Sequence, residues 1–293
     1  MSEDIRKTIR LAKFDRDDLA RLAARLGAGK GAVEKDFLIS IFFLLLAFDK
    51  QFAPFAERAV FRGGTCIKKA YYPSETRFSD DLDFASLSVD EMTLFLGVLE
   101  GLRGQDFGVT TITQARKTFE DSRGLDISLD YTSVLGQPNH IMFNLSTSKS
   151  LRNPERRRID VAPYFASLMP VVPVMDIEEI LAEKLRALLQ RVKPRDVFDV
   201  WFLVKRKMVK IDRRMLEEKL VRSYEAAPEE KKGSAAFYSH LSLIERMGAI
   251  TETAWKQELG GLLVKGFPTR PTITSEVSEI LKGIGDLRVG PKK

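Results

Sequence analysis

The feature that most constrains the fold is an apolar segment at residues 37–48, where Ser40 is the only interruption among twelve residues. A membrane-spanning helix needs roughly 18 to 20 apolar residues, so this segment is too short to cross a bilayer. It has no polar face and therefore predicts a helix buried in a protein core. Before it, Leu19, Leu22 and Leu26 lie at helical spacing, which predicts an amphipathic helix over residues 15–27.

Composition and charge narrow the size, location and partners that we expect. The chain has 293 residues, of which 44% are hydrophobic, and this length is compatible with two modest domains. Lys and Arg outnumber Asp and Glu by 47 to 41, so a nucleic-acid partner is worth considering. The single cysteine, Cys66, cannot form an internal disulfide, and no signal-peptide pattern is present, so we expect a cytoplasmic protein without a membrane anchor.

The order of predicted elements indicates an α+β lobe followed by a helical lobe. We expect strands at residues 59–61, 81–85, 109–117, 125–134 and 141–146, and helices at 65–72 and about 89–103. The last two strands, separated by a turn at residues 136–139, predict an antiparallel hairpin. Further helices are expected at 177–191, 194–207, 212–223, 236–247, 251–264 and 274–284. Pro163, Pro170 and Pro173 suggest a linker, so the domains are expected at 1–170 and 171–293.

The residues that could carry chemistry are a glycine turn and a pair of aspartates. Gly63, Gly64 and Thr65 follow a short predicted strand and begin a predicted helix. Glycines let a backbone approach a phosphate closely, amides at a helix start point toward its oxygens, and a threonine hydroxyl can add a donor. On the next strand, Asp81 and Asp83 must face the same side, because alternate residues of a strand share a face.

Two neighbouring carboxylates repel each other unless a cation lies between them, and hard oxygen ligands suit Mg²⁺ or Mn²⁺. Separately, a Gly-Gly turn and an Asp-x-Asp strand are ordinary structural features. Together, in this order, they favour nucleotide chemistry with two metal ions, in which a hydroxyl attacks a nucleoside triphosphate and pyrophosphate leaves. A P-loop is excluded, because no Gly-Lys-Ser/Thr follows at the required spacing, and the two distant histidines cannot form a zinc site.

Residues 61–71 and 77–84 closely resemble the first motif of the AbiEii/AbiGii toxin family, whose members are polymerase-β-type nucleotidyltransferases and include the mycobacterial MenT-type toxins that modify tRNA. The resemblance also takes in residues 33–36, 181–188 and 193–201, and so spans about residues 33 to 205. It implies a nucleotidyltransferase-type mixed sheet with the metal aspartates, and a helical lobe that closes the cleft for nucleotide and acceptor.

The later motifs add basic and acidic candidates on two predicted helices. Lys184 lies between Ile180 and Leu188 on the apolar edge of the helix at 177–191, so its ammonium faces inward and needs an anion. That anion is a triphosphate if this is a nucleotide site. Otherwise the ammonium extends to solvent or pairs with Asp196 or Asp199. The resemblance implies that the segment containing Asp196 and Asp199 faces the catalytic lobe. Lys184 and Asp196 are therefore candidates for catalysis. Lys184, Asp199 and Arg186 are candidates for nucleotide binding.

One position departs from the family pattern. Relatives place a third carboxylate on the strand that here reads 141–146, where the matching residue is Asn144. An amide oxygen can ligate a metal, but it cannot accept the proton of an attacking hydroxyl. Asp126 or Asp130 on the partner strand could substitute, depending on a hairpin register that sequence does not determine, and Asp160 is a further candidate.

The resemblance implies the toxin half of a toxin–antitoxin pair, with a DNA-binding antitoxin as partner. It further implies transfer of a nucleoside monophosphate from an NTP to the 3′ end of tRNA, which blocks translation. Two alternatives remain open. One is transfer to a small molecule or a protein hydroxyl, and the other is a non-catalytic module that binds nucleotide or a partner protein.

Overall fold

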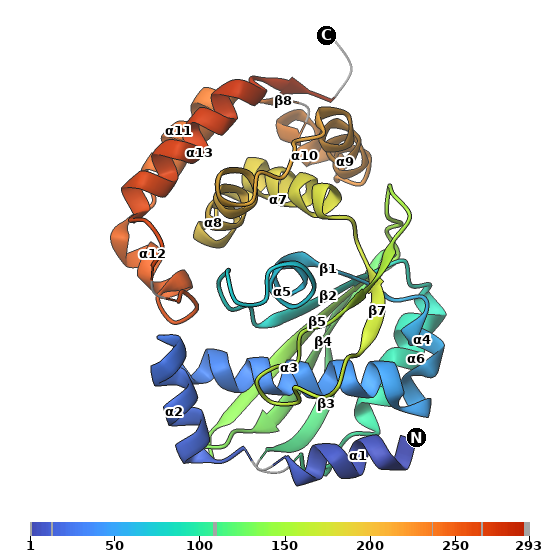
Figure 1. The fold of residues 1–293 in the computed structure, drawn as a ribbon. Coiled ribbons are helices and arrows are strands. Elements are labelled where there is room, and N and C mark those ends of the chain that lie inside the picture. Colours follow the sequence, from blue (N-terminus) through green and yellow to red (C-terminus); the bar gives the residue numbers. More distant parts are fainter. Residues whose placement is uncertain (1, 13, 108–109, 236, 265, 290–293) are drawn as a thin grey trace. The chain divides into compact units, whose positions relative to one another are not determined.

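The structure is a computed structural model that describes residues 2–12, 14–107, 110–235, 237–264 and 266–289. The chain folds as two compact units, shown in Figure 1. The first contains residues 1–176 and 261–265, and the second contains residues 177–260 and 266–293. The division at Asp176 lies beyond the boundary expected near residue 170, because the chain adds one more strand to the first unit before leaving it.

A mixed seven-stranded sheet forms the centre of the first unit, as the predicted α+β class requires. Its order is β3-β4-β5-β2-β1-β7-β6. The strands are β1 (Val60–Arg62), β2 (Asp81–Ala85), β3 (Thr111–Asp121), β4 (Gly124–Thr132), β5 (Pro138–Ser146), β6 (Glu155–Arg158) and β7 (Val171–Val174). β2 pairs antiparallel with β1 and parallel with β5, whereas β4 and β5 form the predicted antiparallel hairpin.

Two of these strands were not predicted. β6 consists of four charged residues without apolar alternation, and β7 contains Pro173 in the region that we expected to be a linker. The sheet tolerates both because β6 is an edge strand and β7 pairs with β1 through a single residue, Phe61 with Val174. Residue 109, the first of the strand expected at 109–117, lies outside the described residues, and the observed strand begins at Thr111.

Helix α3 (Lys30–Phe48) is the predicted buried helix and covers one face of the sheet. Its Phe42 ring lies 6.0 Å from Phe84 on β2 and 4.8 Å from Phe143 on β5. Helix α6 (Val89–Glu100) adds Phe95 to the same face, 5.8 Å from Phe143, and begins with a capping box formed by Ser88 and Glu91. No described helix combines the length and the apolar character needed to cross a membrane.

The remaining helical segments of this unit are short or peripheral. They are α1 (Ser2–Leu11), α2 (Arg16–Leu26), η1 (Lys50–Phe52), α4 (Ala53–Ala56), α5 (Gly63–Cys66) and η2 (Ile67–Tyr71). α5 and η2 together replace the helix expected at residues 65–72, and α1 was not predicted.

Acidic residues at the start of α3 attach the central helix to the elements around it. Glu34 accepts a hydrogen bond from the backbone N–H of Val134, at 2.6 Å, and so holds the end of β4. Asp36 forms an ion pair of 3.0 Å with Lys69 on η2, and these side chains are only 5% and 1% exposed. Lys69 also donates to the hydroxyl of Ser40 at 3.0 Å. Residues 33–36 therefore hold α3 in place against the neighbouring elements of the fold.

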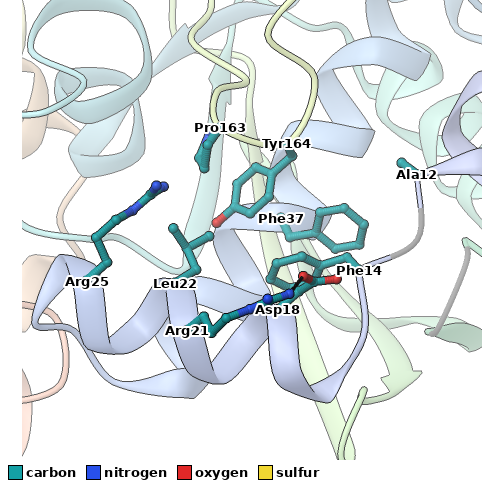
Figure 2. Close-up of a pocket in the computed structure, with 9 residues that line it drawn as sticks. All are labelled: Ala12, Phe14, Asp18, Arg21, Leu22, Arg25, Phe37, Pro163 and Tyr164. Atoms are coloured by element: carbon teal, nitrogen blue, oxygen red, sulfur yellow. Dashed lines mark hydrogen bonds and ion pairs between the residues drawn. The ribbon is translucent and has the colours of Figure 1, made fainter.

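A hollow of about 530 Å³ lies between α2, α3 and the segment around Tyr164. Figure 2 shows the residues that line it. Its aromatic wall is formed by Phe14 and Phe37, whose ring centres are 4.5 Å apart, with Tyr164 packed edge-on against both. The acidic side chain at this hollow, Asp18, is paired with Arg21. The hollow therefore lacks the neighbouring carboxylates that the predicted chemistry needs, and its aromatic residues pack the N-terminal helices together.

The second unit is mainly helical, as predicted. Its elements are α7 (Ile177–Arg191), α8 (Pro194–Trp201), η3 (Phe202–Arg206), α9 (Arg213–Glu225), α10 (Glu229–Ala235), β8 (Phe237–Tyr238), α11 (His240–Gly248), α12 (Glu252–Leu259), α13 (Arg270–Ile284) and β9 (Leu287–Arg288). The helix expected over 236–247 begins at His240, and residue 236 lies outside the described residues. The helix expected over 251–264 ends at Leu259, because Gly261 and Leu262 belong to the first unit, where they accept backbone hydrogen bonds from Gly29 and Phe78.

The buried ion pair on α3 generates a prediction about stability. Asp36→Ala leaves the Lys69 ammonium buried without its carboxylate, and we expect the free energy of unfolding to fall by about 3–5 kcal/mol in urea titrations. The matched control is Arg21→Ala, which breaks an ion pair whose side chains are 76% and 34% exposed. That change should cost about 0–1 kcal/mol. Equal losses in the two variants would contradict the anchoring role of Asp36.

Candidate active site

The two aspartates of β2 lie side by side on the face of the sheet opposite α3. Leu82 and Phe84 are fully buried, whereas Asp81 and Asp83 are half-buried. This alternation is the one expected of a strand with a core on one side only. Because Phe84 packs on α3 through Phe42, the carboxylates point away from the hydrophobic core.

The glycine turn at the end of β1 lies against one of these carboxylates. Gly63 has a φ of 81°, a backbone conformation that glycine adopts readily and other residues rarely do. A Cβ atom at this position would lie 2.0 Å from Oδ2 of Asp83, well inside van der Waals contact. Strand pairing explains this proximity, since Arg62 lies opposite Asp83 in the antiparallel pair of β1 and β2. The turn and the metal candidate therefore form one site.

Gly64 and Thr65 complete the turn in different ways. A Cβ at Gly64 would lie 2.9 Å from Nη2 of Arg77 and 3.0 Å from Oγ of Ser79, so the backbone passes close to both side chains. Sequence reasoning assigned no role to Arg77 or Ser79, although both lie in the segment at 77–84 that resembles the family motif. The hydroxyl of Thr65 is buried and donates to the carbonyl oxygen of Asp81, so it holds the turn onto β2 instead of facing a ligand.

Strand register brings Asn144 and Asp126 into one row with Asp83. Asp83 lies opposite Asn144 on β5, and Asn144 lies opposite Asp126 on β4. The Asn144 amide donates to Oδ1 of Asp83 at 3.2 Å. The pKa of Asp126 is raised, first by burial and then by the negative charges of Asp83 and Asp121. Asp126 is therefore the second acidic residue in this row, after Asp83.

The structure does not bring the other two acidic candidates to this row. Asp130 lies four residues further along β4, opposite His140, and its carboxylate accepts from Arg116 at 2.8 Å and from Gln114 at 2.9 Å. Asp160 follows β6, which is separated from β2 by β1 and β7. Asp126 and Asp130 were equivalent in the sequence, and only the register of the hairpin distinguishes them.

The oxygen donors at this site fit a hard divalent cation. Asp81 and Asp83 supply carboxylates on one face, and the amide oxygen of Asn144 is an acceptable further ligand. Within the described residues, no group of three or more His, Cys, Asp and Glu side chains is arranged to hold a metal ion. A cation bound here therefore needs additional oxygen ligands, which phosphate groups or water provide.

In the second unit, the basic and acidic candidates are paired with each other. Nζ of Lys184 lies 2.8 Å from Oδ2 of Asp199, and these side chains are 14% and 2% exposed. Asp196 accepts from Arg191 at 2.7 Å and 3.1 Å, and Arg186 donates to Gln190 at 2.8 Å. Lys184 thus faces inward as predicted, with Asp199 as its anion.

Comparisons with known proteins give one family and several structures of similar fold. The family model described as nucleotidyl transferase AbiEii toxin, type IV TA system, matches residues 45–281. Among solved structures, the nucleotidyltransferase toxin MenT4 from Mycobacterium tuberculosis is similar, with a TM-score of 0.68 and 22% identity, covering 91% of this chain and 88% of that one. JHP933 from Helicobacter pylori has a TM-score of 0.51 and 16% identity, covering 88% and 93%. At these identities the structures show a shared fold, and no curated protein matches the sequence.

The close approach at Gly63 generates a second prediction. Gly63→Ala places a methyl group onto the Asp83 carboxylate and imposes an unfavourable φ, so we expect nucleotidyl transfer to be lost and the melting temperature to fall. The matched control is Gly97→Ala on α6, where a Cβ meets nothing within 4 Å. That change should leave activity intact and stabilise the helix by about 0.5–1 kcal/mol. Full activity in the Gly63→Ala variant would show that the reaction does not require this close approach of the glycine turn to Asp83.

Proposed function

This chain belongs to the nucleotidyl transferase AbiEii toxin family, whose members are NTP-dependent enzymes, and on that premise we propose that it transfers a nucleoside monophosphate to the 3′ end of tRNA. The observation that supports the proposal most directly is the packing of the Asp83 carboxylate against Gly63, with Asp81 on the same face. This arrangement supports the proposal because two carboxylates able to bind a cation and a glycine turn able to approach a phosphate lie within one site.

The proposed reaction forms one bond and breaks one. The 3′ oxygen of the acceptor forms a bond to the α-phosphorus of the NTP, and the bond from that phosphorus to the bridging oxygen breaks, so that pyrophosphate leaves. The backbone at Gly63 and Gly64 holds the triphosphate, while Asp81 and Asp83 hold two divalent cations. When bound, Mg²⁺ or Mn²⁺ makes the acceptor hydroxyl more acidic and neutralises charge on the leaving group.

Asp126 is proposed as the residue that takes the proton of the attacking hydroxyl. Asn144 occupies the position next to Asp83, and an amide cannot accept that proton. Asp126 lies one strand further along the same row, and its pKa is raised, first by burial and then by the negative charge of Asp83. A carboxylate with a raised pKa is a better proton acceptor than an ordinary one.

The second unit contributes positive charge in this proposal. Lys184 and Arg186 are assigned to the phosphates of the nucleotide, and Asp199 orients the Lys184 ammonium through their 2.8 Å contact. Asp196 holds the adjacent helix end through Arg191. The net charge of +6 is consistent with an RNA acceptor in the cytoplasm. A type IV toxin–antitoxin system also implies an antitoxin, which we propose to be DNA-binding.

Incubation with total tRNA, Mg²⁺ and each α-labelled NTP tests the proposal. We expect the wild-type protein to label tRNA and to release pyrophosphate, because both products come from one displacement at the α-phosphorus. Asp81→Ala and Asp83→Ala should give no label above a reaction without protein, since each removes a metal ligand. Label on tRNA that survives both substitutions would exclude the proposed chemistry.

The same experiment distinguishes the two alternative functions. Label on a protein or on a small molecule, with none on tRNA, would favour a different acceptor. Binding of NTP with Mg²⁺ but no pyrophosphate release would favour a non-catalytic module. The presence of Asn144 in place of a carboxylate is the observation that keeps this second alternative in consideration.

A pair of substitutions on β4 tests the role of Asp126. Asp126→Asn should lower the transfer rate by roughly 10² to 10⁴, the range for loss of a general base. Its melting temperature should not fall, because the change removes repulsion from Asp83. Asp130→Asn, on the same strand but paired with Arg116, should keep transfer near the wild-type rate. Equal transfer rates for Asp126→Asn and Asp130→Asn would show that Asp126 does not act as the proton acceptor.

A further inference from the structure

The row that begins at Asp83 continues to an exposed aromatic side chain on the edge strand. After Asp83, Asn144 and Asp126, the next residue in register is Phe119 on β3. Residues opposite each other on neighbouring strands project from the same face of a sheet, so Phe119 lies on the same face as the carboxylates. At the usual strand spacing of about 4.8 Å, its Cα is about 14 Å from that of Asp83.

The topology of the sheet also determines from which side an acceptor must approach. The glycine turn follows β1, which is the neighbour of β2 on one side, and β5, β4 and β3 lie on the other side. In an in-line displacement, the attacking oxygen and the leaving pyrophosphate are on opposite sides of the α-phosphorus. If the turn holds the triphosphate, as in the proposed function, the acceptor hydroxyl arrives over β5. The nucleotides that precede it then lie over β4 and β3.

Phe119 has the properties of a stacking surface at the end of this track. It is 52% exposed, and of the large apolar side chains exposed in the described part of the chain it alone lies on a strand of the seven-stranded sheet. An aromatic ring that stays exposed on an edge strand exposes the protein to non-specific association. A planar ligand that covers the ring explains its presence, and every nucleobase has such a face.

The charges around Phe119 favour base stacking over capture of phosphates. The nearest basic residues are already paired with acids: Arg116 with Asp130 at 2.8 Å, Lys117 with Glu120 at 2.5 Å, and Arg123 with Asp121 at 3.7 Å. The surface is therefore close to neutral. The exposed charged side chains of β3 also discourage edge-to-edge pairing with a second copy of this chain.

We propose that Phe119 stacks on an unpaired base of the acceptor RNA, a few nucleotides before its 3′-hydroxyl. The inference depends on the proposed function, because it assumes that the acceptor is a nucleic acid with a single-stranded 3′ end. Stacking on an aromatic ring does not depend strongly on the base, so Phe119 contributes affinity and positioning without reading sequence.

Steady-state kinetics of Phe119→Ala and Phe119→Trp test the inference. The alanine variant should raise the KM for tRNA by about 5- to 100-fold, which corresponds to a stacking free energy of about 1–3 kcal/mol. The KM for NTP should not change, and tryptophan should restore the KM for tRNA. The matched control is Leu94→Ala on α6, an apolar side chain that is 51% exposed away from this row. Unchanged KM for tRNA, or an equal rise in both KM values, would overturn the proposal.

A binding measurement separates this inference from the proposed function. An oligoribonucleotide with a fluorescent 2-aminopurine near its 3′ end should be quenched by the wild-type protein and by Phe119→Trp, but much less by Phe119→Ala. Quenching that depends on Phe119, without any nucleotide transfer to RNA, would support base stacking on Phe119 and overturn the proposed reaction. Transfer that is indifferent to Phe119 would overturn only the stacking. A dimer in sedimentation that Phe119→Ala dissociates would instead assign this edge to a second copy.

Discussion

The contact between Gly63 and the Asp83 carboxylate is the constraint on which the site depends. β1 and β2 pair so that the turn after one strand meets an acidic side chain of the other, and no side chain fits between them. The buried hydroxyl of Thr65 fastens the same turn to Asp81. Negative charges thus lie beside the turn that we propose binds a polyphosphate, an arrangement that is favourable only when cations accompany the ligand.

The rest of the first unit supports this contact because its hydrophobic core covers only one face of the sheet. α3 and α6 bury Phe84 and Phe143, and this packing directs the intervening polar residues to the opposite face. The acidic residues at the start of α3 then attach that helix to the β4 end and to η2, which follows the glycine turn. The same packing therefore stabilises the fold and presents the site.

Membership in a nucleotidyltransferase family explains most of these features but not Asn144. The row from Asp83 through Asn144 to Asp126 and Phe119 suggests how the chain accommodates this change. A carboxylate lies one strand further away, at Asp126, and an exposed aromatic ring follows it. Asn144 thus departs from the motif that we expected from the sequence, whereas the glycine turn and the two aspartates follow it.

Local patterns in the sequence determined the buried helix, the alternation of Asp81 and Asp83, and the helical character of the second unit, because periodicity depends only on neighbouring residues. Local patterns did not reveal β6 or β7, whose residues lack alternation or include proline. The tertiary structure alone decided that Asp126 and not Asp130 joins the row of Asp83, and that Lys184 pairs with Asp199. Strand register and helix packing join residues far apart in the chain, and no local pattern encodes which of several equivalent carboxylates will meet.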